Sequence, residues 1–189
     1  MQTKLFTPLL ALAVAMTPGL AAAHTGLGAH GLFDGVLHPF VGADHVLAMV
    51  SVGLWAATLG GRAIWAVPAA FVSMMALGAA LAMGGVALPG IEGMIGLSII
   101  ALGLMLAFSV RVPVLAAAAL VGLFAVFHGA AHGAEMPAGA SGLGYATGFL
   151  TATAVLHAAG IGLGLALARL SLVRVLGAGT ALGGLWLAS

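Results

Sequence analysis

Hydrophobic positions along the chain are grouped in long runs, and polar positions are confined to short breaks between them. Breaking the chain at its Gly, Pro and Arg clusters leaves six apolar segments, near 33–59, 63–84, 90–109, 113–132, 143–168 and 171–187. A helix needs about 20 apolar residues to cross a bilayer, and the connections are too short to hold a soluble domain. The pattern predicts an all-α membrane protein with six transmembrane helices in one domain over residues 24–189.

The first residues have the composition of a secretory signal peptide. Lys4 precedes a short apolar run that contains two prolines, and small residues lead up to His24. Because the run is short for a membrane span, we expect a cleavable signal peptide at 1–23 rather than an uncleaved first helix. The mature chain would then begin outside the cytoplasm.

The charged residues predict the same orientation. Arginine concentrates on the cytoplasmic side of membrane proteins. With the mature N-terminus outside, the cytoplasmic ends of the spans carry Arg62, Arg111, Arg169 and Arg174, and the outer ends carry Asp34, Glu92 and Glu135. We therefore expect a multi-pass protein of the bacterial inner (plasma) membrane with both mature termini in the periplasm. Three spans fall in each half, and each half opens with a histidine-bearing helix, which suggests a 3+3 inverted repeat.

The composition excludes several kinds of site and partner. Residues are 63% hydrophobic and 5% charged, and cysteine is absent, which excludes disulfides, thiolate metal sites and cysteine nucleophiles. A net charge of +1 with scattered arginines argues against nucleic acid as a partner. No Walker motif is present, so this chain does not consume ATP. The seven histidines are the feature that needs an explanation.

The first predicted span contains GVLHPFVGADHVLAM. Four of its residues fall on one stripe of a helix: Asp34, His38, His45 and Met49. Pro39 favours a break or kink that would bring Asp44 toward the same cavity. Along a straight helix, Asp44 and His45 lie about 18 Å below the start of the span, roughly midway through the bilayer. A carboxylate at that depth needs a partner.

Two later spans add further imidazoles. FHGAAHGAEMP places His128, His132 and Glu135 on one helical face, where two imidazoles one turn apart can hold a divalent cation. His157, in ATAVLHAAG, lies deep in the fifth span. Intramembrane ionisable groups are functional candidates, and imidazole with carboxylate suits Ni, Co, Zn or Cu(II). The candidate metal ligands are His38, Asp44, His45, His128, His132, Glu135 and His157, with Met49 as an auxiliary ligand.

The start of the mature chain offers an entrance for an ion. After cleavage, His24 would present its α-amine and its ring nitrogen to the same ion. His30 and Asp34 follow closely and could relay an ion to His38. We therefore treat His24, His30 and Asp34 as candidate entry ligands.

The motifs resemble those of the HupE/UreJ family of bacterial membrane proteins. The family pattern HPxxGxDHxLAM matches residues 38–49 and FHGxAHGxE matches residues 127–135, and LHAAG at 156–160 agrees as well. The resemblance implies a secondary permease that takes up Ni²⁺ or Co²⁺ in support of hydrogenase or urease maturation. It also implies cytoplasmic metal chaperones as partners. The spacing of the residues by itself indicates only a row of nitrogen and oxygen ligands.

We expect transient binding rather than a resident cofactor. The ion would be captured at the entry residues, pass His128, His132 and Glu135, and bind Asp44, His45 and His157 before release into the cytoplasm. Zn²⁺ or Cu²⁺ would suit the same ligands. Ligands must be deprotonated, so uptake should fall as the pH drops below about 6.5. Membrane potential, a concentration gradient and proton exchange all remain open as driving forces.

Three other functions fit parts of the pattern. Three histidines and an acid could form an intramembrane zinc metallohydrolase. GASG at 139–142 has the spacing of rhomboid proteases, with Ser141 as nucleophile and His157 as base, although Ser141 is better explained as a helix cap. A metal-binding accessory or sensor protein without transport is the third. Transport accounts for the most residues, and we expect no enzymatic activity.

Overall fold

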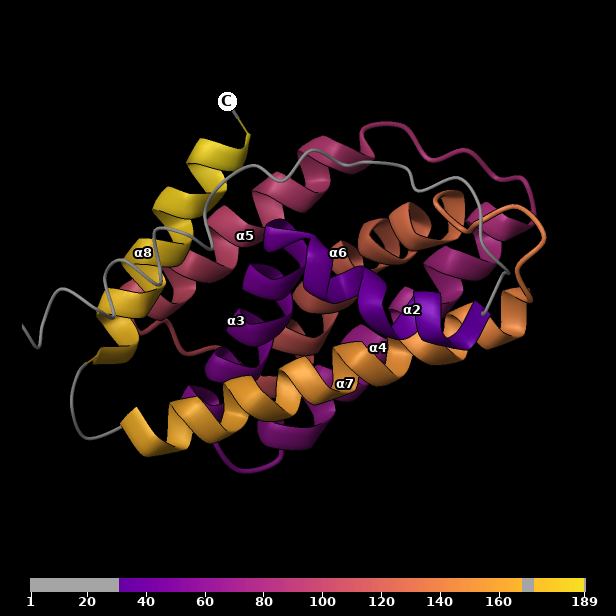
Figure 1. The fold of residues 1–189 in the computed structure, drawn as a ribbon. Coiled ribbons are helices and arrows are strands. Elements are labelled where there is room, and N and C mark those ends of the chain that lie inside the picture. The colour runs from indigo at the N-terminus through magenta and orange to yellow at the C-terminus, as the bar shows by residue number, and fades with distance from the viewer. Residues whose placement is uncertain (1–30, 168–171, 189) are drawn as a thin grey trace, which may run out of the picture.

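A computed structural model describes residues 31–167 and 172–188. Within these ranges the chain is all-helical, as the sequence predicted, and it contains no strand. The helices are α2 (Gly31–Val41), α3 (Ala43–Leu59), α4 (Ala63–Met83), α5 (Ile91–Ala107), α6 (Val114–Ala134), α7 (Gly142–Leu167) and α8 (Leu172–Leu187) (Figure 1). The predicted signal peptide at 1–23, together with His24 and His30, lies outside the described residues.

Three helices are long and apolar enough to cross a membrane: α4, α6 and α7. α2 and α3 pass the same test together, but they meet at 83°, so they form a broken span or a re-entrant loop. α5 and α8 are apolar but have only 17 and 16 residues. The described residues therefore contain three or four candidate spans, and the crossing of the membrane by α5 and α8 stays a prediction.

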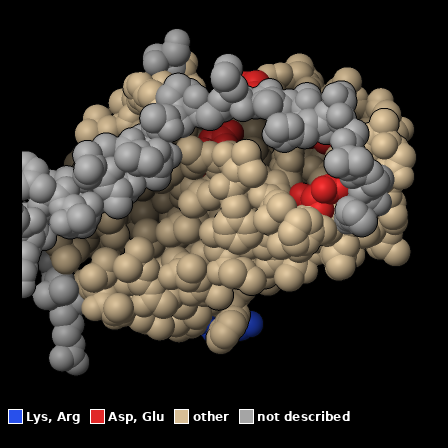
Figure 2. Space-filling view, in the orientation of Figure 1, with Lys and Arg blue, Asp and Glu red and all other residues tan. Residues whose placement is uncertain are grey.

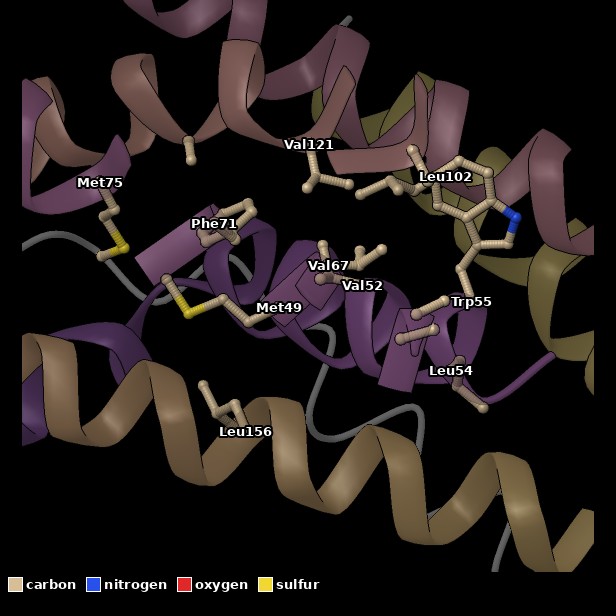
Figure 3. Close-up of a cluster of buried hydrophobic side chains, with 14 of the residues drawn as sticks. Met49, Val52, Leu54, Trp55, Val67, Phe71, Met75, Leu102, Val121 and Leu156 are labelled. Atoms are coloured by element: carbon tan, nitrogen blue, oxygen red, sulfur yellow. The ribbon is translucent and has the colours of Figure 1, made fainter. Parts of the chain in front are cut away.

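α3 lies in the middle of the bundle, between α4, α5 and α7 (Figure 1). The closest helix pairs are α4 with α6, α3 with α7, and α5 with α8, while α2 lies along α7. Buried side chains from α3, α4, α6 and α7 interlock around Met49, Phe71 and Val121, and Trp55 fills the far end of the cluster (Figure 3). The Trp55 indole donates a hydrogen bond of 3.0 Å to the carbonyl of Val110. The core thus ties α3 to the connection between α5 and α6.

Glycines set the distance between the paired helices. A Cβ on Gly53 of α3 would collide with the carbonyl of His157, and one on Gly160 of α7 would collide with the carbonyl of Val50. Small residues at such points let helix backbones approach closely in a membrane protein. α7 is therefore pressed against α3 at the level of His157.

The packing has only part of the symmetry that the predicted inverted repeat requires. The pairing of α3 with α7 corresponds to that of α6 with α4. α3 also packs against α5, whereas α6 makes no comparable contact with α8 in the described residues. The inverted repeat stays a prediction.

Acidic and basic side chains lie in different parts of the visible face. Acidic atoms lie in the upper part of the molecule and basic atoms at its lower edge (Figure 2). This separation agrees with the grouping of arginines and carboxylates that the sequence predicts. The assignment of one end to the periplasm stays a prediction.

Candidate metal path

Gly42 interrupts the helix between the two halves of the first histidine motif. Pro39 lies inside α2, and Gly42 is extended, with φ −86° and ψ 114°, so the chain turns by 83°. The sequence placed four residues on one stripe of a straight helix: Asp34, His38, His45 and Met49. That prediction is wrong because the bend puts the first two on α2 and the last two on α3, although the ring centroids of His38 and His45 remain 6.4 Å apart. The depth of about 18 Å, taken along a straight axis, fails for the same reason.

His38 of α2 and Glu135 at the end of α6 form the exposed end of the site. His38 Nε2 lies 2.7 Å from Glu135 Oε2, and the two side chains are 31% and 51% exposed. The hydrogen bond from His38 lowers the pKa of the Glu135 carboxyl below its usual value, against the opposing effect of burial. Asp34, in the first turn of α2, makes no hydrogen bond or ion pair within the described residues. The contact between His38 and Glu135 therefore joins two motifs that lie far apart in the sequence.

Four imidazole rings form a continuous row of contacts. The ring centroids of His38 and His132 are 4.9 Å apart, those of His132 and His45 are 4.5 Å apart, and those of His45 and His128 are 5.1 Å apart. His132 also stacks on Phe149, with centroids 4.7 Å apart. The His45 side chain is 9% exposed, while His128 and His132 are fully buried. The row leads from the half-exposed His38 into the interior.

Asp44 and His45 form a pair at the start of α3. Asp44 Oδ1 accepts the backbone N–H of His45 at 2.8 Å and lies 2.9 Å from its Nδ1. The ring therefore donates its Nδ1–H to the carboxylate, and the sequence-based expectation that this carboxylate has a partner is confirmed. This second bond fixes the ring, as carboxylate partners do for metal-binding histidines.

A phenyl ring connects the row to His157. The Phe71 ring lies 5.6 Å from His128 and 5.0 Å from His157, centroid to centroid. His157 Nδ1 lies 2.7 Å from the carbonyl of Met49, which can only accept, so Nδ1 carries the proton. The Met49 sulfur accepts a hydrogen bond of 3.3 Å from the Thr153 hydroxyl. Met49 thus positions His157 through its backbone.

Five ring nitrogens are buried without a hydrogen-bond partner: His45 Nε2, His128 Nδ1, both nitrogens of His132, and His157 Nε2. Buried polar atoms are nearly always hydrogen-bonded, so this cluster is unusual. No group of three or more His, Asp or Glu side chains in the described part of the chain has the geometry of a formed metal site. The rings must therefore rotate or move toward one another before several of them can bind one ion.

Sequence comparisons agree with the motifs. The family model described as "HupE / UreJ protein" matches residues 12–187. The chain belongs to the HupE/UreJ family. The curated protein named "Protein HupE" from Rhizobium leguminosarum bv. viciae is 52% identical over 161 residues, which cover 85% of this chain and 83% of that protein. No solved structure matches the chain.

Several residues of this HupE/UreJ site were not anticipated from the sequence. Ser98, Phe71, Phe149 and Thr153 all contact a candidate ligand. Each lies in an apolar helix and has a residue type common in helix packing, so nothing in the local sequence distinguishes it. Only the arrangement of the helices reveals them.

The structure also argues against the protease reading of Ser141 in this family member. Ser141 Oγ accepts the backbone N–H of Gly144 at 3.2 Å, which is a helix cap. His157 lies in the same helix, and a separation of sixteen residues amounts to about 24 Å of helix rise. Ser141 and His157 therefore cannot act together on one bond.

Proposed function

We propose that this HupE/UreJ protein is a secondary permease that takes up Ni²⁺ or Co²⁺ across the bacterial inner membrane. The cargo moves along the row from Glu135 and His38, past His132, His45 and Asp44, to His128 and His157. Nothing along this route is a resident cofactor. Zn²⁺ and Cu²⁺ fit the same ligand types, so the metal has to be identified by measurement.

The observation that carries the proposal is the set of five buried imidazole nitrogens without partners. A histidine that serves only packing would have both nitrogens bonded, because an unmet buried polar atom costs about 1–3 kcal/mol. Repeating this cost on four neighbouring rings requires compensation, and a divalent cation that binds the lone pairs supplies it. Ring contacts join His38, His132, His45 and His128, so an ion can pass from one of these rings to the next. The step from His128 to His157 passes the Phe71 ring.

Among the described residues the candidate ligands are not gathered into a cage, which supports transport over storage. Conduction needs binding that is favourable enough for entry and weak enough for release. Rings that must move to gather around an ion give weaker binding than a preformed site, because the movement costs free energy. The exposure of Glu135 and His38 supports an entrance at this end of the row.

The proposed cellular setting follows from family membership. The resemblance links the family to hydrogenase and urease maturation, so we propose that cytoplasmic metal chaperones of these pathways receive the ion. We also propose six spans, with α5 and α8 crossing the membrane as shorter helices, and periplasmic mature termini. The entry role of His24, His30 and Asp34 belongs to the same proposal.

Metal accumulation in cells tests the proposal. Cells at low external metal are analysed for nickel, cobalt and zinc with and without the protein, and with His45→Ala or Asp44→Ala at equal membrane expression. We expect nickel or cobalt accumulation that both substitutions abolish. Ser51→Ala is the control, since Ser51 is buried on the same helix and lines an apolar groove with Val50 and Leu163.

Three results would contradict the proposal. If expression of the protein leaves all three metals unchanged, it does not transport them. Metal that stays bound to purified protein without entering cells would identify an accessory or sensor protein instead. Accumulation that survives His45→Ala would mean that the ion takes another path.

A further inference from the structure

His128 is joined to a helix that contributes no ring to the row. Its Nε2 lies 2.9 Å from the Ser98 hydroxyl of α5. The same hydroxyl oxygen lies 2.6 Å from the carbonyl of Ile95, one turn earlier in α5. Ser98 and His128 are both fully buried. Ser98 was not among the ligands or auxiliary residues that the sequence suggested.

The two contacts fix the direction of the hydrogen bonds. A serine hydroxyl has one proton, and a carbonyl oxygen can only accept, so the proton of Ser98 goes to Ile95. Ser98 Oγ must then accept from His128, whose Nε2 therefore carries the ring proton. If Ser98 instead donated its proton to His128 Nε2, the bond to the Ile95 carbonyl would be lost and the ring proton would lie on Nδ1, buried and unpaired. Only the first arrangement makes both bonds.

We propose that Ser98 is the positioning residue of His128: its hydroxyl, held by the Ile95 carbonyl, accepts the Nε2–H and leaves Nδ1 as the lone pair that binds the ion. Nδ1 is buried and has no partner, which is the state that metal binding requires of an imidazole. That Nδ1 meets a metal rests on the proposed function. The position of the ring proton does not.

The same arrangement recurs at two other rings. His45 donates Nδ1–H to Asp44, and His157 donates Nδ1–H to the Met49 carbonyl. Each of these rings has its proton on the nitrogen that faces an oxygen and leaves the other nitrogen buried and unpartnered. In metal proteins such second bonds fix the tautomer and orientation of a ligand histidine. Among the three acceptors, Ser98 alone contributes a neutral side chain.

The ring proton can be observed without metal. Purified protein with isotope-labelled histidine is examined by NMR at about pH 8, well above the range in which a free imidazole protonates. His128→Gln identifies the signals of this ring. We expect the nitrogen chemical shifts to show a hydrogen-bonded Nε2–H and a bare Nδ1, and the Nε2 signal to move in Ser98→Ala. A proton on Nδ1 in the wild type, or unchanged signals in Ser98→Ala, would overturn the proposal.

Measurements of metal uptake distinguish a positioning role of Ser98 from a role in helix packing. Loss of a second bond to a ligand histidine typically costs about 10- to 100-fold in metal affinity, so Ser98→Ala should raise the half-saturating Ni²⁺ or Co²⁺ concentration by that factor. Ser98→Thr keeps a hydroxyl that can bond the preceding turn and should restore most of the affinity. Ser51→Ala, which removes a buried hydroxyl elsewhere, should behave as the wild type.

The outcomes distinguish this inference from the proposed function. If Ser98→Thr is as impaired as Ser98→Ala at equal amounts of folded protein, the hydroxyl is not what matters and Ser98 is not a positioning residue. If the wild type takes up no metal at all, the proposed function fails, and the NMR measurement then decides the role of Ser98 on its own.

Discussion

Gly42 gives the sharpest test of the geometry at the helix break. A Cβ added there would lie 2.6 Å from Asp44 Oδ1 and 3.0 Å from His45 Nδ1. Ordinary contacts begin at 3.4 Å, so the carboxylate oxygen would have to move by about 0.8 Å. The backbone of Gly42 does not require glycine, because its φ of −86° suits any residue. The three atoms nearest to such a Cβ all belong to Asp44 and His45, so Gly42→Ala acts first on this pair.

The displacement should break the bond between Asp44 and the His45 ring. A hydrogen bond to a charged group contributes about 1.5–3 kcal/mol, which corresponds to a change of one to two powers of ten in affinity. We expect Gly42→Ala to raise the half-saturating metal concentration for uptake by about 10- to 100-fold, with normal amounts of folded protein in the membrane.

Gly93→Ala is the matched control for Gly42→Ala. A Cβ on Gly93 meets no atom within 4 Å, so uptake should keep wild-type affinity. The assay is the initial rate of nickel or cobalt uptake against external metal, at equal membrane expression. Wild-type affinity in Gly42→Ala would mean that the orientation of the His45 ring does not matter for transport.

Three further predictions follow from individual contacts. The lowered pKa of Glu135 keeps this carboxyl ionised as the pH falls to below its usual value near 4.5, so its charge is constant between about pH 7.5 and 5.5. Glu135→Gln should therefore slow uptake at every pH in that range, and wild-type uptake rates in this variant would show that the carboxylate is not part of the entrance. Gly129→Ala would place a Cβ against the Met75 carbonyl. The substitution should lower the stability of the fold by about 1–3 kcal/mol or more, measured by thermal denaturation, and with it the amount of folded protein. Ser141→Ala should keep near wild-type uptake after losing about 1 kcal/mol of capping, whereas complete loss of uptake would show that Ser141 does more than cap α7.

The helix positions were largely predictable because the breaks are chemically obvious. Gly60–Gly61–Arg62 and Val110–Arg111–Val112–Pro113 interrupt the apolar runs, and the structure ends helices at both places. The break in the first motif was harder to place. Pro39 was the visible signal, yet the helix continues through it and stops at Gly42. Proline removes one backbone hydrogen bond, and the helix continues for two residues after it, Phe40 and Val41.

The ligand residues were predictable, and their partners were not. Histidine and aspartate stand out in an apolar sequence because their cost in a membrane demands a reason. Ser98 and Phe71 carry no such cost, since a serine can bond its own preceding turn and a phenylalanine is apolar. Their contacts with His128 depend on how α4, α5 and α6 meet. That information lies in the packing of whole helices rather than in any local pattern.

The glycine crossings connect helix packing to the chemistry of the rings. Gly160 follows His157 by less than one turn, and its lack of a side chain lets α7 approach the backbone of α3 at Val50. Because of this approach, the His157 ring reaches the neighbouring Met49 carbonyl at 2.7 Å. Backbone carbonyls within a helix are normally shielded by side chains, so a ring from another helix reaches one only where the two backbones come close. A larger residue at position 160 would therefore disturb the tautomer of His157 as well as the packing of α7.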